Sequence, residues 1–182
     1  MKHAPPPPQW DYVLEVYARP GVAQACLQLQ ARCRVDVVVM LHAMYVFAML
    51  GIRLDATTLA EADARVRPWR EQVTVPLRQL RTALKEGFEQ FSQGTVDAAR
   101  QKIKAAELAA ESTAFAALVP FSSGERMENG DLPQAKALLQ AMITMYSPVE
   151  SEDQLREGFV NASTQTLCEA CLSVAALRSD SK

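Results

Sequence analysis

The chain has 182 residues, of which 49% are hydrophobic and 22% are charged, as is typical of a folded globular domain and not of a disordered chain. Its 19 lysines and arginines against 21 acidic residues give a net charge of −2. This balance argues against nucleic-acid or membrane binding driven by overall charge.

The N-terminus contains four consecutive prolines, Pro5 to Pro8, and lacks the apolar segment of a secretory signal. We expect residues 1–16 to be a flexible leader and short lead-in, followed by a single all-α domain over residues 17–182. The four cysteines are too few for a disulfide framework. They are expected to be buried thiols in a cytoplasmic protein, with no metal site.

Apolar residues recur at helical spacing throughout the domain, and no segment alternates as a strand does. The first predicted helix is Val22–Cys33. The second, Val37–Leu50, is apolar on all sides, with Asp36 as its N-cap and Gly51 at its end. An all-apolar helix must be buried, so we expect a bundle of six or seven helices around Val37–Leu50.

A third helix is predicted over residues 58–66, and Pro68 fits the first turn of a fourth. In this fourth helix, seven apolar residues recur every three or four positions from Trp69 to Phe91. Pro76 lies inside this pattern and should kink the helix. Beyond it we expect an alanine-rich helix at 96–118, a loop at 119–131, a helix at 132–146 capped by Asp131, and a helix capped by Ser151 that ends near residue 177.

Sequence signatures of catalysis are missing: there is no phosphate-binding loop, dinucleotide fingerprint, nucleophile elbow or zinc-protease motif. His42, the histidine outside the leader, lies in the central apolar helix and is expected to be a core residue with one hydrogen-bond partner. The sequence therefore leans away from an enzyme and predicts no cofactor.

The strongest positive feature is the basic face of the fourth helix, where Arg78, Arg81 and Lys85 share one side. This face is either an anion site, with arginine as the fork-shaped donor, or a solvated surface whose arginines pair with Glu107 and Glu111 on the next helix. Trp69 beside Arg70 fits a surface recognition pair, although its place at the start of the apolar stripe favours burial.

Several short motifs in this order resemble a known family. They are Tyr17-Ala-Arg-Pro-Gly-Val22, Cys26-Leu-Gln-Leu-Gln30, Asp36-Val37, Trp69-Arg70, Pro76-Leu-Arg78, Leu80-Arg81, Leu84-Lys85 and Glu107-Leu108. Together they are similar to the bacterial domain-of-unknown-function family 2390 from about Tyr17 to Glu111. The resemblance implies a small helical protein and supplies no activity, cofactor or partner.

The resemblance also leads us to expect a glycine near Arg34 and an asparagine at Val38. A glycine would suit a left-handed helix end, so its replacement by arginine should cost up to about 1 kcal/mol if that conformation persists. If the asparagine belongs to a polar site in the family, this chain lacks that group.

Two hypotheses about function follow. The first is a non-enzymatic protein that binds a protein partner or a second copy of itself through residues 69–85, without nucleic acid or membrane. The second is a binder of, or enzyme on, a small anionic, partly apolar metabolite held by Arg70 and Arg78, with His42, Glu107 and Glu111 in a polar pocket. Arginines without carboxylate partners in a closed pocket would favour the second.

Overall fold

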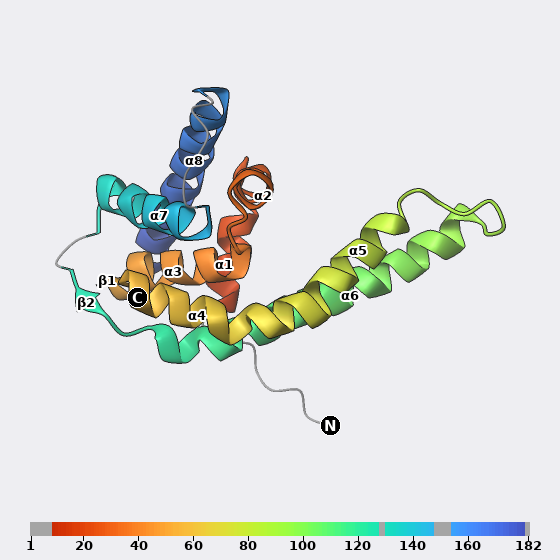
Figure 1. Cartoon of the computed structure of the whole chain (residues 1–182), viewed down its shortest axis with the longest axis horizontal. Coiled ribbons are helices and arrows are strands. Elements are labelled where there is room, and N and C mark those ends of the chain that lie inside the picture. The colour runs from red at the N-terminus through yellow and green to blue at the C-terminus, as the bar shows by residue number, and fades with distance from the viewer. Residues whose placement is uncertain (1–8, 128–129, 148–153, 181–182) are drawn as a thin grey trace.

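The computed structural model describes residues 9–127, 130–147 and 154–180, with the backbone alone for 154–157. Its helices are α1 (Trp10–Tyr17), α2 (Val22–Cys33), α3 (Val37–Leu50), α4 (Ala56–Trp69), α5 (Val75–Ala83), α6 (Gln93–Leu118), α7 (Leu132–Tyr146) and α8 (Gln154–Ser179) (Figure 1). A π-helix, Arg70–Thr74, joins α4 to α5 without a break, and a 3₁₀ turn, Val119–Phe121, follows α6. The predicted all-α fold is confirmed, with seven helices in the described residues when α4 to α5 counts as one.

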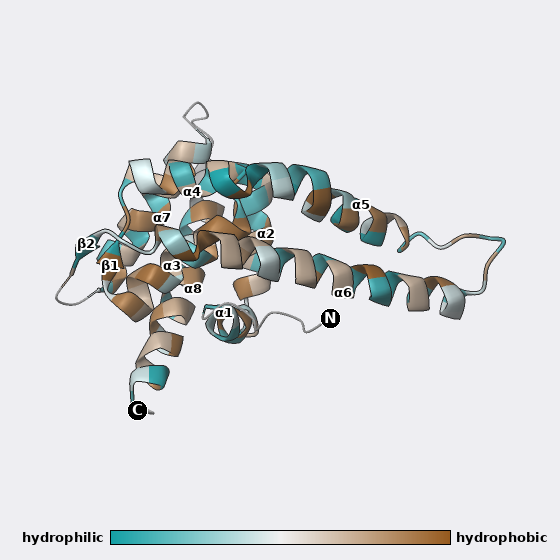
Figure 2. Cartoon of the chain, turned by 90° about the horizontal axis from the view of Figure 1, so that it is seen from below, coloured by the Kyte–Doolittle hydropathy of each residue, from teal (hydrophilic) through white to brown (hydrophobic). Residues whose placement is uncertain are grey.

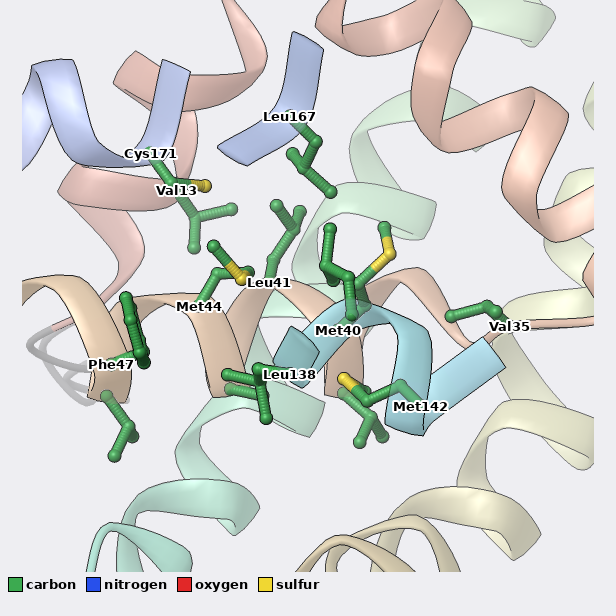
Figure 3. Packing of buried hydrophobic residues seen from close by; sticks show 14 of the residues in the cluster. Val13, Val35, Met40, Leu41, Met44, Phe47, Leu138, Met142, Leu167 and Cys171 are labelled. Carbon is green, nitrogen blue, oxygen red and sulfur yellow. The ribbon is translucent and has the colours of Figure 1, made fainter. Parts of the chain in front are cut away.

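Helix α3 lies at the centre of the bundle, as predicted, and contacts α1, α4, α6, α7 and α8. Its Met40 and Met44 are fully buried, and Figure 3 shows them between Leu138 of α7 and Leu167 of α8. The Asp36 carboxylate accepts the Val39 N–H at 2.8 Å, which confirms the predicted cap. In the part of the chain that the structure describes, no helix is long and apolar enough to cross a membrane.

The predicted lead-in needs correction, because Trp10–Tyr17 forms helix α1. Tyr12 and Val16 of α1 are fully buried, and the Tyr12 hydroxyl donates a hydrogen bond to the Cys171 carbonyl at 3.0 Å. Apolar residues do recur at helical spacing here, at Trp10, Val13 and Tyr17, so the sequence carried a signal for this helix. The four prolines themselves lie outside the described residues.

The loop predicted at 119–131 contains a short strand, which sequence analysis missed. Strand β2 (Glu125–Arg126) pairs antiparallel with β1 (Ile52–Arg53), and Arg53 forms an ion pair with Glu125 at 2.5 Å. Two residues per strand are too short to produce an alternating pattern that a sequence can reveal.

The predicted boundary between the third and fourth helices is also wrong. Helix α4 begins at Ala56, where the Asp55 carboxylate accepts the Thr58 N–H at 2.7 Å, and it continues through Pro68. Asp55 is therefore the N-cap in place of Thr58. Proline at position 68 removes one N–H from α4, but α4 continues into the π-helix and no new helix starts at Pro68.

Pro76 was expected to kink this helix, and the structure shows how the helix accommodates it. Immediately before Pro76, the Val75 N–H bonds to the carbonyl of Arg70, five residues back, which is the π-helical pattern. Proline lacks an N–H and crowds the carbonyl four residues before it. The widened turn relieves this conflict and keeps the helix continuous.

Helix α5 and the N-terminal part of α6 lie side by side and project from the rest of the bundle (Figures 1 and 2). We call residues 75–107 the arm. The helix predicted to reach Phe91 ends at Ala83, so Phe88 and Phe91 lie in the turn at the arm tip. No residue of α5 is buried, so its periodic apolar residues do not form a core stripe.

The four cysteines lie on α2 and α8, and all are buried and free. Burial raises the pKa values of the Cys26 and Cys168 thiols to about 12. These thiols are therefore protonated and unreactive at neutral pH. The prediction of buried core thiols is confirmed for Cys26, Cys33, Cys168 and Cys171.

Replacing Arg34 with glycine should stabilise the protein by about 1 kcal/mol, because Arg34 ends α2 with φ +57°, the left-handed conformation that glycine adopts without strain. The matched control is Ala31→Gly, an exposed position in the last turn of the same helix, which should destabilise it by about 0.5–1 kcal/mol. Urea unfolding of the three proteins measures both effects. A loss of stability on Arg34→Gly would show that the arginine side chain contributes more than the strain costs.

Candidate functional site

The arginines of α5 are paired with carboxylates of α6. Arg78 donates from Nε to Glu107 at 2.8 Å and from Nη2 to Glu111 at 2.8 Å, and Arg81 donates from Nε to Glu107. Glu107 is buried and therefore needs these partners. Of the two interpretations of the basic face, pairing with Glu107 and Glu111 is the one that the structure shows for Arg78 and Arg81.

The environment shifts the pKa values of the two glutamates in opposite directions. Burial opposes ionisation of Glu107, but hydrogen bonds from Arg81 and Arg78 outweigh it and lower the pKa of this carboxyl. At Glu111, burial prevails over the attraction of Arg78, and the neighbouring Glu107 adds to it, so the pKa of Glu111 is raised. The fold therefore stabilises the charged form of Glu107, whereas it favours the protonated form of Glu111.

Arg70 belongs to a second cluster, at the start of the π-helix. Its Nη1 lies 2.8 Å from Asp36 and 2.7 Å from Asp63. Asp63 is 3% exposed and also accepts hydrogen bonds from Arg67 at 2.6 Å and from the Tyr146 hydroxyl at 2.7 Å. Burial opposes ionisation of Asp63, but these donors prevail and hold its pKa below the ordinary value.

Sequence reasoning named neither Asp63 nor Tyr146. The spacing of four between Asp63 and Arg67 on one helix is a signal that could have indicated their pairing. No local pattern connects Tyr146 to Asp63, because these residues are 83 positions apart and meet only through the packing of α7 on α4.

The other predicted site residues do not join these clusters. Trp69 was expected to be buried, yet it is 39% exposed, because its ring lies at the edge of the α4–α6 contact and donates from Nε1 to the Ala110 carbonyl at 2.9 Å. Lys85 is exposed, just beyond the end of α5. Among the described residues, Trp69 and Lys85 therefore take no part in the ion pairs of Arg70, Arg78 and Arg81.

His42 is buried in α3, as expected of a core histidine. Its Nε2 is 3.2 Å from the Phe121 carbonyl, and Nδ1 has no hydrogen-bond partner among the described residues. Burial lowers the pKa of His42 and keeps the ring neutral. His42 does not line the cavity that contains Glu107 and Glu111.

A cavity of about 350 Å³ lies where the arm meets the bundle, and we call it the groove. Its inner wall is apolar and buried, with Val13, Leu41 and Phe115 among the residues that line it. Arg78, Arg81, Lys104, Glu107 and Glu111 line one side. Val38, where the family resemblance leads us to expect asparagine, also faces this cavity, so the groove lacks that polar group.

The rim of the groove is unusually apolar for a surface. Leu14 and Tyr17 of α1, Leu27 of α2 and Leu108 of α6 all line it, with exposures of 45%, 40%, 53% and 41%. Single exposed apolar residues are common, but several around one cavity mark a binding surface. This gathering is not visible in the sequence, because it depends on how three helices pack.

A second, polar cavity of about 510 Å³ lies over the Asp63 cluster and is lined by Arg34, Asp36, Arg67, Arg70 and Tyr146 among others. Gln30, Asp36, Arg70, Val38 and Arg78 line a narrow space of about 20 Å³ between the two cavities. Within the described residues, no group of three or more histidine, cysteine or acidic side chains is arranged to hold a metal ion.

The model of one protein family, described as a protein of unknown function (DUF2390), matches residues 8–118. The chain belongs to this family. The match spans α1 to α6 and therefore includes the groove, the arm and both arginine clusters apart from Tyr146. No curated protein and no solved structure is significantly similar to the chain.

Neutralising the two glutamates should have opposite effects on stability. Glu107→Gln removes a charge that the fold stabilises and should cost about 2–3 kcal/mol at pH 7. Glu111→Gln removes a charge that burial disfavours and should change stability by less than about 1 kcal/mol, towards a gain. Urea unfolding at pH 7 measures both.

The pH dependence of the unfolding free energy tests the direction of the Glu107 pKa shift. A carboxyl with a lowered pKa stabilises the fold above its unfolded pKa and loses that contribution as the pH falls through the folded pKa. The deficit of Glu107→Gln should therefore shrink below about pH 4.5. An equal loss in both variants would contradict the opposite pKa directions.

Proposed function

We propose that this protein works by binding a polypeptide partner in the groove, without catalysing a reaction. The observation that carries the proposal is the apolar rim formed by Leu14, Tyr17, Leu27 and Leu108 around one cavity. In the free protein these apolar side chains are exposed to water. A partner that covers them stabilises the complex by about 25 cal/mol per Å² of apolar surface removed from water. The surface differs from the helix at 69–85 of the first hypothesis, although Arg78 and Arg81 form part of it.

A macromolecular partner fits the groove better than a small anion does. A ligand that fills about 350 Å³ would occupy the inner wall and leave the rim in water. Arg78 and Arg81 already hold the carboxylates of Glu107 and Glu111, so a small anion would have to displace them. A partner segment that lies across the rim covers the apolar side chains without breaking these pairs.

The side chains also indicate the chemistry of the partner. Lys104 lines the groove and forms no ion pair among the described residues. A segment with apolar side chains on one face and a carboxylate beside them would satisfy both the rim and Lys104. The four free thiols are typical of a reducing compartment, and we therefore place the interaction in the cytoplasm.

A photo-crosslinking amino acid placed at Leu108 tests this function in cells that express the protein naturally. Leu108 lines the groove and is 41% exposed, and Val119, just beyond the same helix, is equally exposed at 41% and lies outside the groove. We expect a polypeptide adduct from position 108 and none from position 119. Mass spectrometry of the adduct should locate the attached segment.

The chemistry of the attached segment decides the outcome. An apolar segment with neighbouring carboxylates supports the proposal. A basic or wholly polar segment, equal adducts from both positions, or no polypeptide adduct would overturn it. An adduct with a small molecule alone would overturn it in favour of the second hypothesis, a small anionic ligand.

A further inference from the structure

The arm has too little core to account for its own stability. Among residues 75–107, Val96 and Glu107 are the only buried ones, and none belongs to α5. Helices in proteins are stabilised mainly by packing of an apolar face. Helix α5 contacts chiefly α6 and the π-helix, and Leu80 on α5 is 48% exposed. The arm thus presents apolar side chains that no other described part of this chain covers.

The arm tip has the chemistry that the groove requires. Phe88 and Phe91 are 48% and 61% exposed, and Glu86 and Glu89 lie within two residues of Phe88 in the sequence. Two aromatic side chains beside two carboxylates match an apolar rim beside Lys104. We propose that the groove receives the arm tip of a second copy of this chain, so that two arms pack antiparallel in a symmetric dimer. This inference rests on the proposed function and names its partner.

The charges along the arm support the antiparallel arrangement. Near the tip, over residues 82–97, one cation stands against three carboxylates: Lys85, Glu86, Glu89 and Asp97. Nearer the bundle, the arm carries five cations and one carboxylate: Arg78, Arg81, Arg100, Lys102, Lys104 and Glu107. An antiparallel pair of arms places the acidic tip of each copy against the basic base of the other, twice. A parallel pair would place like charges together.

The dimensions of the arm agree with this pairing. From Gln93 at the tip, Lys104 to Glu111 beside the groove lie 11 to 18 residues along α6, or about 17–27 Å at 1.5 Å per residue. Because both copies have the same arm length, a two-fold axis across the paired arms brings each tip to the other groove. The interface is isologous and closes with two molecules.

Reciprocal charge reversal tests the dimer. The tip variant Glu86→Lys/Glu89→Lys and the base variant Arg100→Glu/Lys104→Glu should each have a dimer dissociation constant at least about tenfold above that of the unaltered protein. Mixed one to one, they should form a heterodimer, because both tip-to-base contacts are again of opposite charge. Sedimentation equilibrium, with one variant labelled, measures the 20.0 kDa chain against its dimer.

The matched control is Glu61→Lys/Glu169→Lys, which reverses two exposed glutamates outside the arm and should leave the dimer unchanged. Recovery on mixing also shows that both arm variants are folded. A monomeric unaltered protein, undiminished self-association in either arm variant, or no heterodimer on mixing would overturn the inference.

Failure of the dimer is distinguishable from failure of the groove. An adduct from position 108 that maps to residues 86–91 of the same chain supports both proposals. An acidic, apolar segment of a different protein, with a monomeric chain in solution, overturns the dimer and leaves the groove function standing. Absence of any polypeptide adduct overturns both.

Discussion

The position of the arm depends on a single guanidinium, that of Arg70. It bridges Asp36 at the start of the central helix and Asp63 on α4, while the Tyr146 hydroxyl of α7 donates to the same Asp63 oxygen. Four elements therefore converge on one ion cluster. Buried ion pairs add little net stability, because desolvation offsets most of the attraction, but removing one partner is costly. We interpret the cluster as a device that fixes where α4 leaves the bundle.

The π-helix that begins at Arg70 carries this orientation into the arm. One extra residue in a helical turn rotates everything beyond it by about 100° relative to a regular helix. Beyond the widened turn, Arg78 and Arg81 face α6 and bind Glu107. The first cluster thus sets the direction of the helix, and the second attaches its base to α6. The second cluster lines the groove, whereas the first lines the neighbouring polar cavity.

The sequence predicted the elements whose signals are local. Helices α2 and α3 were predicted with their observed ends. For α3 the end signals are local, since Asp36 and Gly51 directly flank the apolar run. The pairing of Arg78 and Arg81 with carboxylates of the next helix was one of two interpretations that the sequence left open, and the structure shows it. The apolar repeat that continues to Phe91 was misleading, because periodicity shows that a face is apolar and not that another element covers it. The Asp63 cluster and the groove rim escaped prediction because their members meet only through tertiary packing.

The uncovered apolar surface lies at the two ends of one rigid element. Phe88 and Phe91 precede α6, whereas the groove begins at Lys104 and Leu108 on the same continuous 26-residue helix. A helix does not fold back on itself, so the tip and the groove of one molecule are held apart. The tip therefore cannot cover the groove of its own molecule. Any contact between them requires a second molecule, which makes it dependent on concentration and open to competition. A different protein with an acidic, apolar segment would have to displace the arm tip. Such a partner must therefore bind the groove more tightly than the arm tip of a second copy does.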